Sequence, residues 1–185
     1  ASGQKSLALL AVAGRHAPAE ARWAAKMRKI PKTPAEIPTP DVIRSMSGLD
    51  FMRKIMAGEL AAAPIAETLD YDLVEVEPGR VTFAGRASFA AYNPIGSVHG
   101  GWFGTLLDSC MACAVQTMLP AGRAYTTLEY KINILRAATV DSGLIRAEGN
   151  AIHVGRRTAT AEGRMIGEDG KLYATGTTTC LVFEI

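Results

Sequence analysis

The chain has 185 residues, of which 48% are hydrophobic and 21% charged, a composition suited to one folded domain with an appendage. Aromatic residues make up only 6%, so we expect a core built mainly from aliphatic side chains, alanine and glycine. No apolar run approaches the roughly 20 residues of a membrane-spanning helix. The sequence therefore predicts a soluble protein without a membrane span.

The net charge of +2 conceals two unequal parts of the chain. Residues 1–54 hold ten Lys and Arg against four Asp and Glu, whereas residues 55–185 hold ten against fourteen. The larger part is therefore mildly acidic, which argues against nucleic acid as a partner. The odd number of cysteines, three, and the absence of a clear secretory signal favour a reducing, cytoplasmic location.

Two of the cysteines stand in the C-x-x-C spacing Cys110-Met111-Ala112-Cys113. A redox or zinc site with this spacing needs an exposed helix start or a second pair of ligands, and the sequence shows neither. We therefore expect two small core residues on a buried helix, and no metal site.

Residues 1–40 form a basic extension that ends in a linker rich in proline and threonine. Three interpretations are open for it: a processed targeting peptide, a basic helix that binds a membrane or a partner, and a variable extension without a specific role, which we favour. From residue 41 to 56, apolar residues recur at helical spacing. This pattern predicts a helix with Asp41 as its cap, Gly48 as a break and Gly58 as its stop. The folded domain is accordingly placed at residues 41–185.

The rest of the chain predicts an α+β fold. Strand-like segments 71–76 and 80–88 flank the turn sequence Glu77-Pro78-Gly79 and predict a hairpin. Segment 102–119 is apolar on nearly every face, as in a helix buried on most sides, and Pro120 is expected to end it. Four further strands are expected as a meander, at 125–136, 143–154, 158–166 and 171–183. We expect an antiparallel sheet of five or six strands curled around one long central helix.

The central helix is preceded by His99-Gly100-Gly101. Two glycines at the entry of a buried helix allow a ligand to approach the backbone closely. The free N–H groups of the first turn, at the positive end of the helix dipole, can bind an anion or a polarised carbonyl oxygen. For His99 itself, a neutral ring that orients the loop and a ring that carries a proton remain equally open.

Asp108 lies two turns into the most apolar helix of the chain. A lone buried carboxylate costs on the order of several kcal/mol or takes up a proton. Either Asp108 pairs with a buried arginine, caps backbone groups or faces solvent at a groove, or it lies at an interface or cleft, where it attacks an electrophile or activates water. The sequence has no H-E-x-x-H spacing, no phosphate-binding P-loop and no G-x-S-x-G elbow.

Several motifs follow one another in a specific order. They are Asn93-Pro94-Ile95-Gly96-Ser97-Val98-His99-Gly100-Gly101, Leu106-Leu107-Asp108-Ser109, Arg123-Ala124-Tyr125-Thr126-Thr127-Leu128-Glu129, Gly155-Arg156-Arg157-Thr158-Ala159 and Gly176-Thr177-Thr178. In this order and spacing they resemble the PaaI-type acyl-CoA thioesterases of the hotdog superfamily, over about residues 41–185. The resemblance implies the hotdog fold, in which a curled antiparallel sheet surrounds one long helix.

The resemblance also implies an activity: hydrolysis of an aryl- or medium-chain acyl-CoA to the free acid and CoA, without a metal or organic cofactor. The Gly100 amide would polarise the thioester carbonyl. Asp108 would come from the other subunit of a homodimer or homotetramer and act as nucleophile or general base. Asn93 and His99 would position the thioester or the nucleophile, and Thr127 would hold the attacking water or Asp108.

Arg156 and Arg157, which follow Gly155, would hold the phosphates of CoA through bidentate contacts; ordinary arginines at a strand edge are the alternative. Two other functions stay open, a hotdog enoyl-CoA hydratase and a non-catalytic acyl-CoA-binding or regulatory protein. The sequence does not determine acyl specificity. Three large residues are candidates both for the acyl pocket and for the core: Trp102, Phe103 and Met111.

Overall fold

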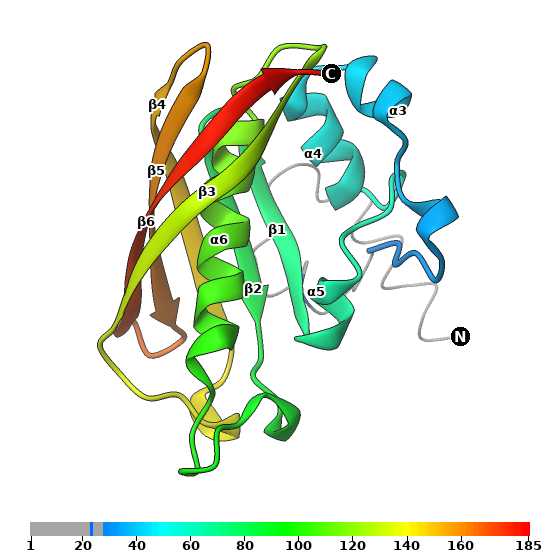
Figure 1. Ribbon diagram of the computed structural model, residues 1–185. Coiled ribbons are helices and arrows are strands. Elements are labelled where there is room, and N and C mark those ends of the chain that lie inside the picture. The colour runs from blue at the N-terminus through cyan, green and yellow to red at the C-terminus, as the bar shows by residue number, and fades with distance from the viewer. Residues whose placement is uncertain (1–22, 24–27) are drawn as a thin grey trace.

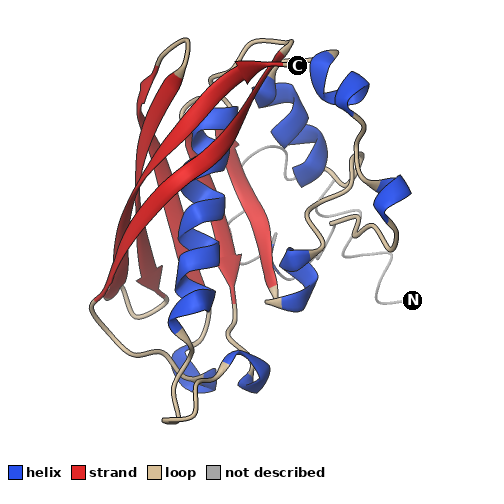
Figure 2. Cartoon of the chain, in the orientation of Figure 1, coloured by secondary structure: helices blue, strands red, loops and turns tan. Residues whose placement is uncertain are grey.

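The computed structural model describes residue 23 and residues 28–185. Of the basic extension, residues 1–22 and 24–27 lie outside this part, so its three interpretations stay open and the boundary at residue 40 remains a prediction. One antiparallel sheet of six strands curls around a long helix, α6 (Gly100–Gln116), and shorter helices lie on the open side (Figures 1 and 2). This is the α+β arrangement expected from the sequence. Among the described helices, none is long and apolar enough to cross a membrane.

The expected helix over 41–56 is interrupted. It consists of α3 (Pro40–Arg44) and α4 (Gly48–Met56). The break falls at residues 45–47, because the Ser47 hydroxyl caps α4 by accepting a hydrogen bond from the Asp50 N–H at 3.1 Å. Asp41 was wrong as a cap, since α3 begins one residue before it.

Gly48 is the first residue of α4 and not the point at which a helix breaks. Only glycine fits at this position, because a Cβ there would overlap the Gln116 carbonyl at the end of α6. Gly58 is confirmed as a stop, because it follows the cap of α4 with a left-handed φ of 75°. Farther along, η2 (Pro34–Glu36) lies before α3, and α5 (Ile65–Thr68) leads into the sheet.

All six expected strands are present with boundaries shifted by a few residues. They are β1 (Tyr71–Glu77), β2 (Arg80–Gly85), β3 (Arg123–Ile134), β4 (Ile145–Val154), β5 (Thr158–Gly167) and β6 (Leu172–Glu184), with η3 (Phe89–Ala91) and η4 (Val140–Ser142) in the connections. Their order across the sheet is β1-β2-β4-β5-β6-β3. The expected meander was therefore wrong for β3, which pairs with β6 at the sheet edge and not with β4. Alternation of apolar residues shows which face of a strand is buried, but does not select the neighbouring strand.

The end of α6 also differs from the expectation that Pro120 would stop it. The helix ends at Gln116, and the next three residues bind other elements. The Thr117 hydroxyl accepts a hydrogen bond from the Gly79 N–H at 2.8 Å, and the Leu119 carbonyl accepts one from the Gly48 N–H at 2.9 Å. Contacts with the β1–β2 turn and with α4 thus hold this end of the helix, and Pro120 lacks the N–H that would bond to the Gln116 carbonyl four residues before it.

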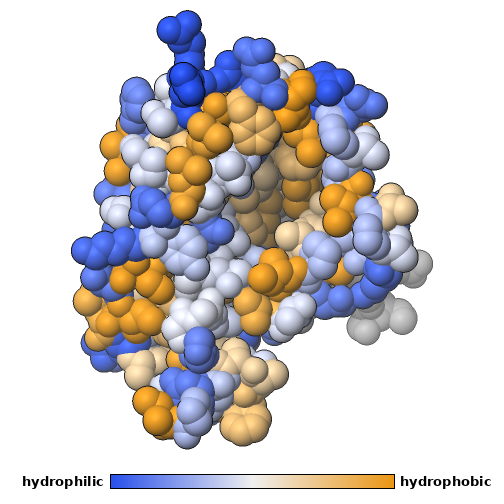
Figure 3. All heavy atoms as spheres, in the orientation of Figure 1, coloured by the Kyte–Doolittle hydropathy of each residue, from blue (hydrophilic) through white to orange (hydrophobic). Residues whose placement is uncertain are grey.

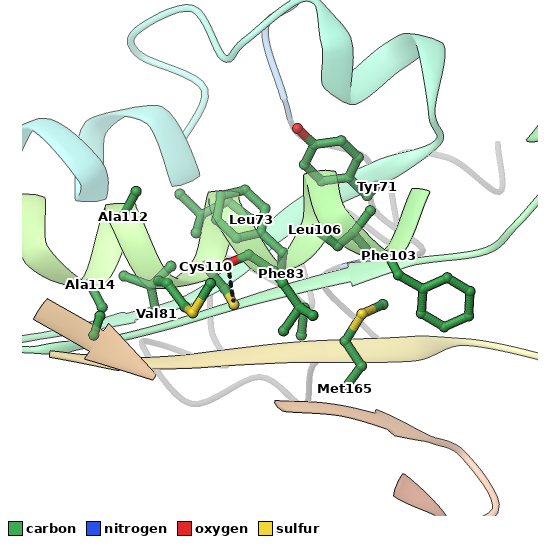
Figure 4. Packing of buried hydrophobic residues seen from close by; sticks show 14 of the residues in the cluster. Tyr71, Leu73, Val81, Phe83, Phe103, Leu106, Cys110, Ala112, Ala114 and Met165 are labelled. Atoms are coloured by element: carbon green, nitrogen blue, oxygen red, sulfur yellow. Dashed lines mark hydrogen bonds between the residues drawn. The ribbon is translucent and has the colours of Figure 1, made fainter. Parts of the chain in front are cut away.

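The core is the layer between α6 and the sheet (Figure 4). Cys110 is fully buried there, and its thiol donates to the Leu107 carbonyl at 3.3 Å. The expected core position is thus confirmed for Cys110, whereas Cys113 is half-buried and packs against the core from outside it. Among the described residues, no group of three or more His, Cys, Asp or Glu could hold a metal ion.

Three glycines lie in register on neighbouring strands and bring the sheet close to α6. Gly149 on β4 pairs with Gly163 on β5, which pairs with Gly176 on β6. A Cβ at Gly149 would overlap the backbone of Cys110, whereas a Cβ at Gly163 would approach the side chain of Met111 at 2.8 Å. The helix therefore rests directly on the backbone of the sheet at Gly149.

We expect Gly149→Ala to lower the free energy of unfolding by about 1–3 kcal/mol, because the helix backbone must move to admit the new methyl group. Gly163→Ala is the matched control and should cost less, since the flexible Met111 side chain can shift. Urea unfolding followed by circular dichroism measures both values. Equal losses for the two variants would contradict the close approach at Gly149.

Candidate active site

The loop before α6 is held by Asn93. Its side-chain oxygen accepts hydrogen bonds from the Ile95 N–H at 3.1 Å and the Ser97 N–H at 3.2 Å, and its amide nitrogen donates to the Ser97 hydroxyl at 3.0 Å. Gly96 completes the turn with a φ of 90°. The structure thus gives Asn93 a defined task, which is to shape the loop that delivers the start of the helix.

His99 is the N-cap of α6. Its Nδ1 accepts a hydrogen bond from the Gly101 N–H at 2.8 Å, so a neutral ring carries its proton on Nε2. The Gly100 N–H, in the first position of the helix, has no acceptor within residues 28–185. Gly100 is also partly exposed. This N–H can therefore donate to a carbonyl oxygen or an oxyanion.

Asp108 is half-buried on α6 and faces the start of β3. The Thr127 hydroxyl donates to its Oδ1 at 2.9 Å. Burial raises the pKa of Asp108, and the bond from Thr127 offsets part of that rise. Among the described residues no cation forms an ion pair with Asp108, so no arginine of this part of the chain pairs with the acid.

Asp108 lines a cleft of about 390 Å³ between α6, β1, the start of β3, and helices α4 and α5. Figure 3 shows it as a hollow with an apolar floor. Near Asp108, the Tyr71 hydroxyl lies 3.1 Å from the Ser109 hydroxyl. Burial raises the pKa of Cys113 to about 12, so its thiol is protonated at neutral pH and is no nucleophile. Two carboxylates line the cleft: Asp72, which lies 3.8 Å from the Arg28 guanidinium, and Asp108, which has no cation partner among the described residues.

The sequence analysis did not predict the wall of the cleft that α4 and the linker after it form. The apolar residues of α4 and the linker after it have ordinary core spacing, and nothing in their order shows that they face Asp108. Conversely, Trp102, Phe103 and Met111 are at most 2% exposed and belong to the core. None of these three lines the cleft.

Arg156 and Arg157 lie exposed in the turn between β4 and β5. Arg123, at the start of β3, joins them by donating a hydrogen bond to the Arg156 carbonyl. The three arginines border one shallow hollow together with the end of β6. Gly155 serves the turn itself, since its N–H donates to the Thr158 carbonyl at 2.9 Å. The sequence analysis did not assign Arg123 to this group, because only the pairing of β3 with β6 brings it beside Arg156.

The structure does not bring the two halves of the expected site together within one chain. Gly100 and Asp108 both lie on α6, eight residues apart, which corresponds to a rise of about 12 Å along the helix. Asp108 and Thr127 form one group, and the loop of Asn93, His99 and Gly100 forms another.

A family model described as "Thioesterase superfamily" matches residues 95–174, which include α6, β3, β4 and β5. This part of the chain, residues 95–174, is a thioesterase-superfamily domain. A 1,4-dihydroxy-2-naphthoyl-CoA hydrolase of Listeria monocytogenes is 26% identical to it over 118 residues, covering 64% of this chain and 94% of the relative. These matches confirm the resemblance and the expected class of enzyme.

Solved structures show the same fold. A variant of the phenylacetic acid degradation protein PaaI from Thermus thermophilus is 28% identical, with a TM-score of 0.58 and coverage of 64% of this chain and 97% of the other. A hypothetical thioesterase from Streptococcus pneumoniae, solved with coenzyme A, is 25% identical, with a TM-score of 0.58 and coverage of 64% and 91%. The expected hotdog fold is confirmed.

The contact between Thr127 and Asp108 has a measurable consequence. Thr127→Ala removes the hydrogen bond that lowers the pKa of Asp108, so the carboxyl group should ionise at a higher pH than in the wild type. Thr127→Ser keeps the hydroxyl and should titrate like the wild type. Titration of carboxyl-labelled aspartate by ¹³C NMR, with Asp108→Asn to assign the signal, measures this. An unchanged or lower pKa in Thr127→Ala would contradict the described contact.

Proposed function

We propose that this protein hydrolyses acyl-CoA thioesters to a free acid and CoA, with water as the second substrate. The observation that carries the proposal is the half-buried Asp108 carboxylate, held by Thr127 at the edge of an apolar cleft. A carboxylate whose pKa is raised is well suited to accept a proton from water. The naphthoyl-CoA hydrolase and the thioesterase solved with coenzyme A support CoA thioesters as the substrate class.

A second copy of the chain is proposed to complete the site by pairing along β3. This strand has twelve residues and forms one edge of the sheet, with β6 as its only neighbour in the sheet of the described chain. Large apolar residues are exposed on it, among them Leu128 at 58% and Tyr130 at 46%. A long, apolar and unpaired edge is a template for pairing with another strand.

The contacts of α6 with β3 support this pairing. Gly100 faces Ile134 near the end of β3, Gly104 faces Tyr130 near its middle, and Asp108 binds Thr127 near its start. If two β3 strands pair antiparallel around Tyr130, the end of one strand lies beside the start of the other. Gly100 of the partner subunit then approaches Asp108 of the first chain, and each dimer contains two such sites.

In the proposed reaction the Gly100 N–H binds the thioester carbonyl oxygen and stabilises the charge that develops there. As general base, Asp108 takes a proton from water while the water oxygen attacks the carbonyl carbon. The tetrahedral intermediate then expels the CoA thiolate, which takes the proton from Asp108. As nucleophile, Asp108 would instead attack the carbonyl carbon, break its bond to sulfur and expel the CoA thiolate, which leaves a mixed anhydride. Water then cleaves the anhydride to the free acid and the Asp108 carboxylate, and the proton released in this step goes to the thiolate. Arg123, Arg156 and Arg157 supply cations for the phosphates of CoA.

Asp108→Asn should reduce acyl-CoA hydrolysis by about 10²–10⁴-fold, because the amide keeps the shape and loses the base. Thiol release from a panel of acyl-CoAs measures the rate. The stability of the folded state should not decrease. Because the pKa of Asp108 is raised in the folded protein, its ionisation opposes folding at neutral pH, and the variant should melt at the same or a higher temperature. Hydrolysis at nearly the wild-type rate would exclude Asp108 as base or nucleophile.

The Gly100 N–H can be removed without disturbing the helix. Proline is favoured at the first position of a helix and lacks an N–H, and His99 already has the extended conformation that a residue before proline requires. Gly100→Pro should therefore lower kcat by about 10²–10³-fold. Gly100→Ala keeps the N–H and adds only a methyl group, which would lie 3.3 Å from Ile134 Cδ1, so it is the matched control and should lower kcat much less than Gly100→Pro.

Mixing the two inactive variants tests the shared site. After subunit exchange, an equal mixture of Asp108→Asn and Gly100→Pro should recover about a quarter of wild-type activity, because each mixed dimer has one intact site of two. No recovery, with exchange shown by mass spectrometry, would mean that Asp108 and Gly100 do not act across subunits.

A further inference from the structure

We propose that the cleft between α4 and α6 binds the apolar acyl group of the substrate, and that α4 sets the size of the group accepted. This inference rests on the proposed hydrolysis of acyl-CoA. The cleft, at about 390 Å³, is within the range of roughly 300–1,000 Å³ usual for small-molecule sites. It begins at Asp108 and Thr127, where the thioester carbonyl must lie, and continues away from them between mainly apolar side chains, with Asp72 and Gln116 also on its wall.

The wall facing α6 comes from α4 and the segment that follows it. Phe51 and Ile55 are one turn apart, so they lie on the same face of α4, and both line the cleft with Ala63 beyond them. Arg53, on the same helix, is exposed and does not line it.

The opposite wall is α6 itself. Ala112 is one turn beyond Asp108, on the same side of the helix, and lines the cleft with a small side chain. In Figure 4, Ala112 and the ring of Tyr71 point away from Met165 and the sheet on that side of α6. The hydroxyls of Tyr71 and Ser109 lie 3.1 Å apart and can satisfy each other. The space beyond Asp108 is thus suited to a hydrocarbon group and not to the charged CoA portion.

Helix α4 is anchored well enough to act as a fixed wall. The Ser47 hydroxyl caps it, Gly48 packs against the end of α6, and the Gly48 N–H donates to the Leu119 carbonyl at 2.9 Å. The family model begins at residue 95, so α4 lies outside the matched part of the chain. In this proposal the limit on acyl size is set by residues that the family model does not include.

Binding of non-hydrolysable CoA thioethers tests the inference without requiring turnover. S-ethyl-, S-butyl-, S-hexyl-, S-octyl- and S-dodecyl-CoA, with S-benzyl-CoA for an aryl group, are titrated into the full chain by calorimetry. Affinity should rise about fourfold for each added methylene that enters the cleft, and then level off when the cleft is full. The aryl probe shows whether a ring is accepted in the same space.

Variants of the cleft wall should move the point at which affinity levels off. Phe51→Ala enlarges the cleft and should shift it to longer tails. Ala63→Phe fills the cleft from its exposed rim, where folding is not at risk, and should weaken S-octyl-CoA at least tenfold while leaving S-ethyl-CoA unchanged. Arg53→Ala is the matched control on α4 and should bind every probe like the wild type.

The outcomes separate this inference from the proposed reaction. Affinities that do not depend on tail length, or that stay the same in Phe51→Ala and Ala63→Phe, would overturn the inference even if the protein hydrolyses acyl-CoA. Affinity that depends on tail length, with no thiol release from any acyl-CoA, would support the cleft as an acyl site and exclude the hydrolase.

Discussion

The structure depends on the need to cover helix α6 on nearly all sides. The helix is apolar around most of its circumference, so exposure of any face to water is unfavourable. A flat sheet covers one face of a helix, whereas this sheet curls around it from β1 to β3 (Figure 1). Gly149 allows direct contact of helix and sheet backbone. Helices α4 and α5 cover part of the side that the sheet leaves open.

The uncovered remainder of α6 carries the acid of the proposed reaction. Asp108 is the only carboxylate of α6, and it lies on the side where the sheet ends and the cleft begins. It is buried enough for its pKa to rise, and it is exposed enough to meet a ligand. A carboxylate in the covered part of the core would be neutral and inert, and one in open water would keep its ordinary pKa.

The same helix separates the two groups that the proposed reaction needs. Its rise keeps the Gly100 N–H about 12 Å from Asp108, so no side-chain movement joins them in one chain. The apolar edge of β3 supplies a geometry in which a twofold axis would do so. Placing the acid and the amide on one rigid helix therefore makes catalysis depend on assembly, in the proposed scheme.

Local sequence patterns determined the elements and the candidate groups of this protein. Alternation predicted the strands, uniform apolar character predicted α6, and Gly100 and Asp108 stood out because a glycine pair and an acid are unusual in a buried helix. Each of these patterns extends over a few neighbouring residues, so it can be recognised without knowing how the rest of the chain packs. The resemblance added Thr127, and the structure confirms its contact with Asp108.

Only the tertiary structure decided which strands, helices and side chains are neighbours. The place of β3 at the sheet edge, the end of α6 at Gln116, and the union of Arg123 with Arg156 all result from contacts between residues far apart in the chain. The wall formed by α4 is another such case, because Phe51 has the same local pattern whether it faces a core or a cleft. Periodicity shows that a side chain is buried, but the partner that buries it depends on how the whole chain packs.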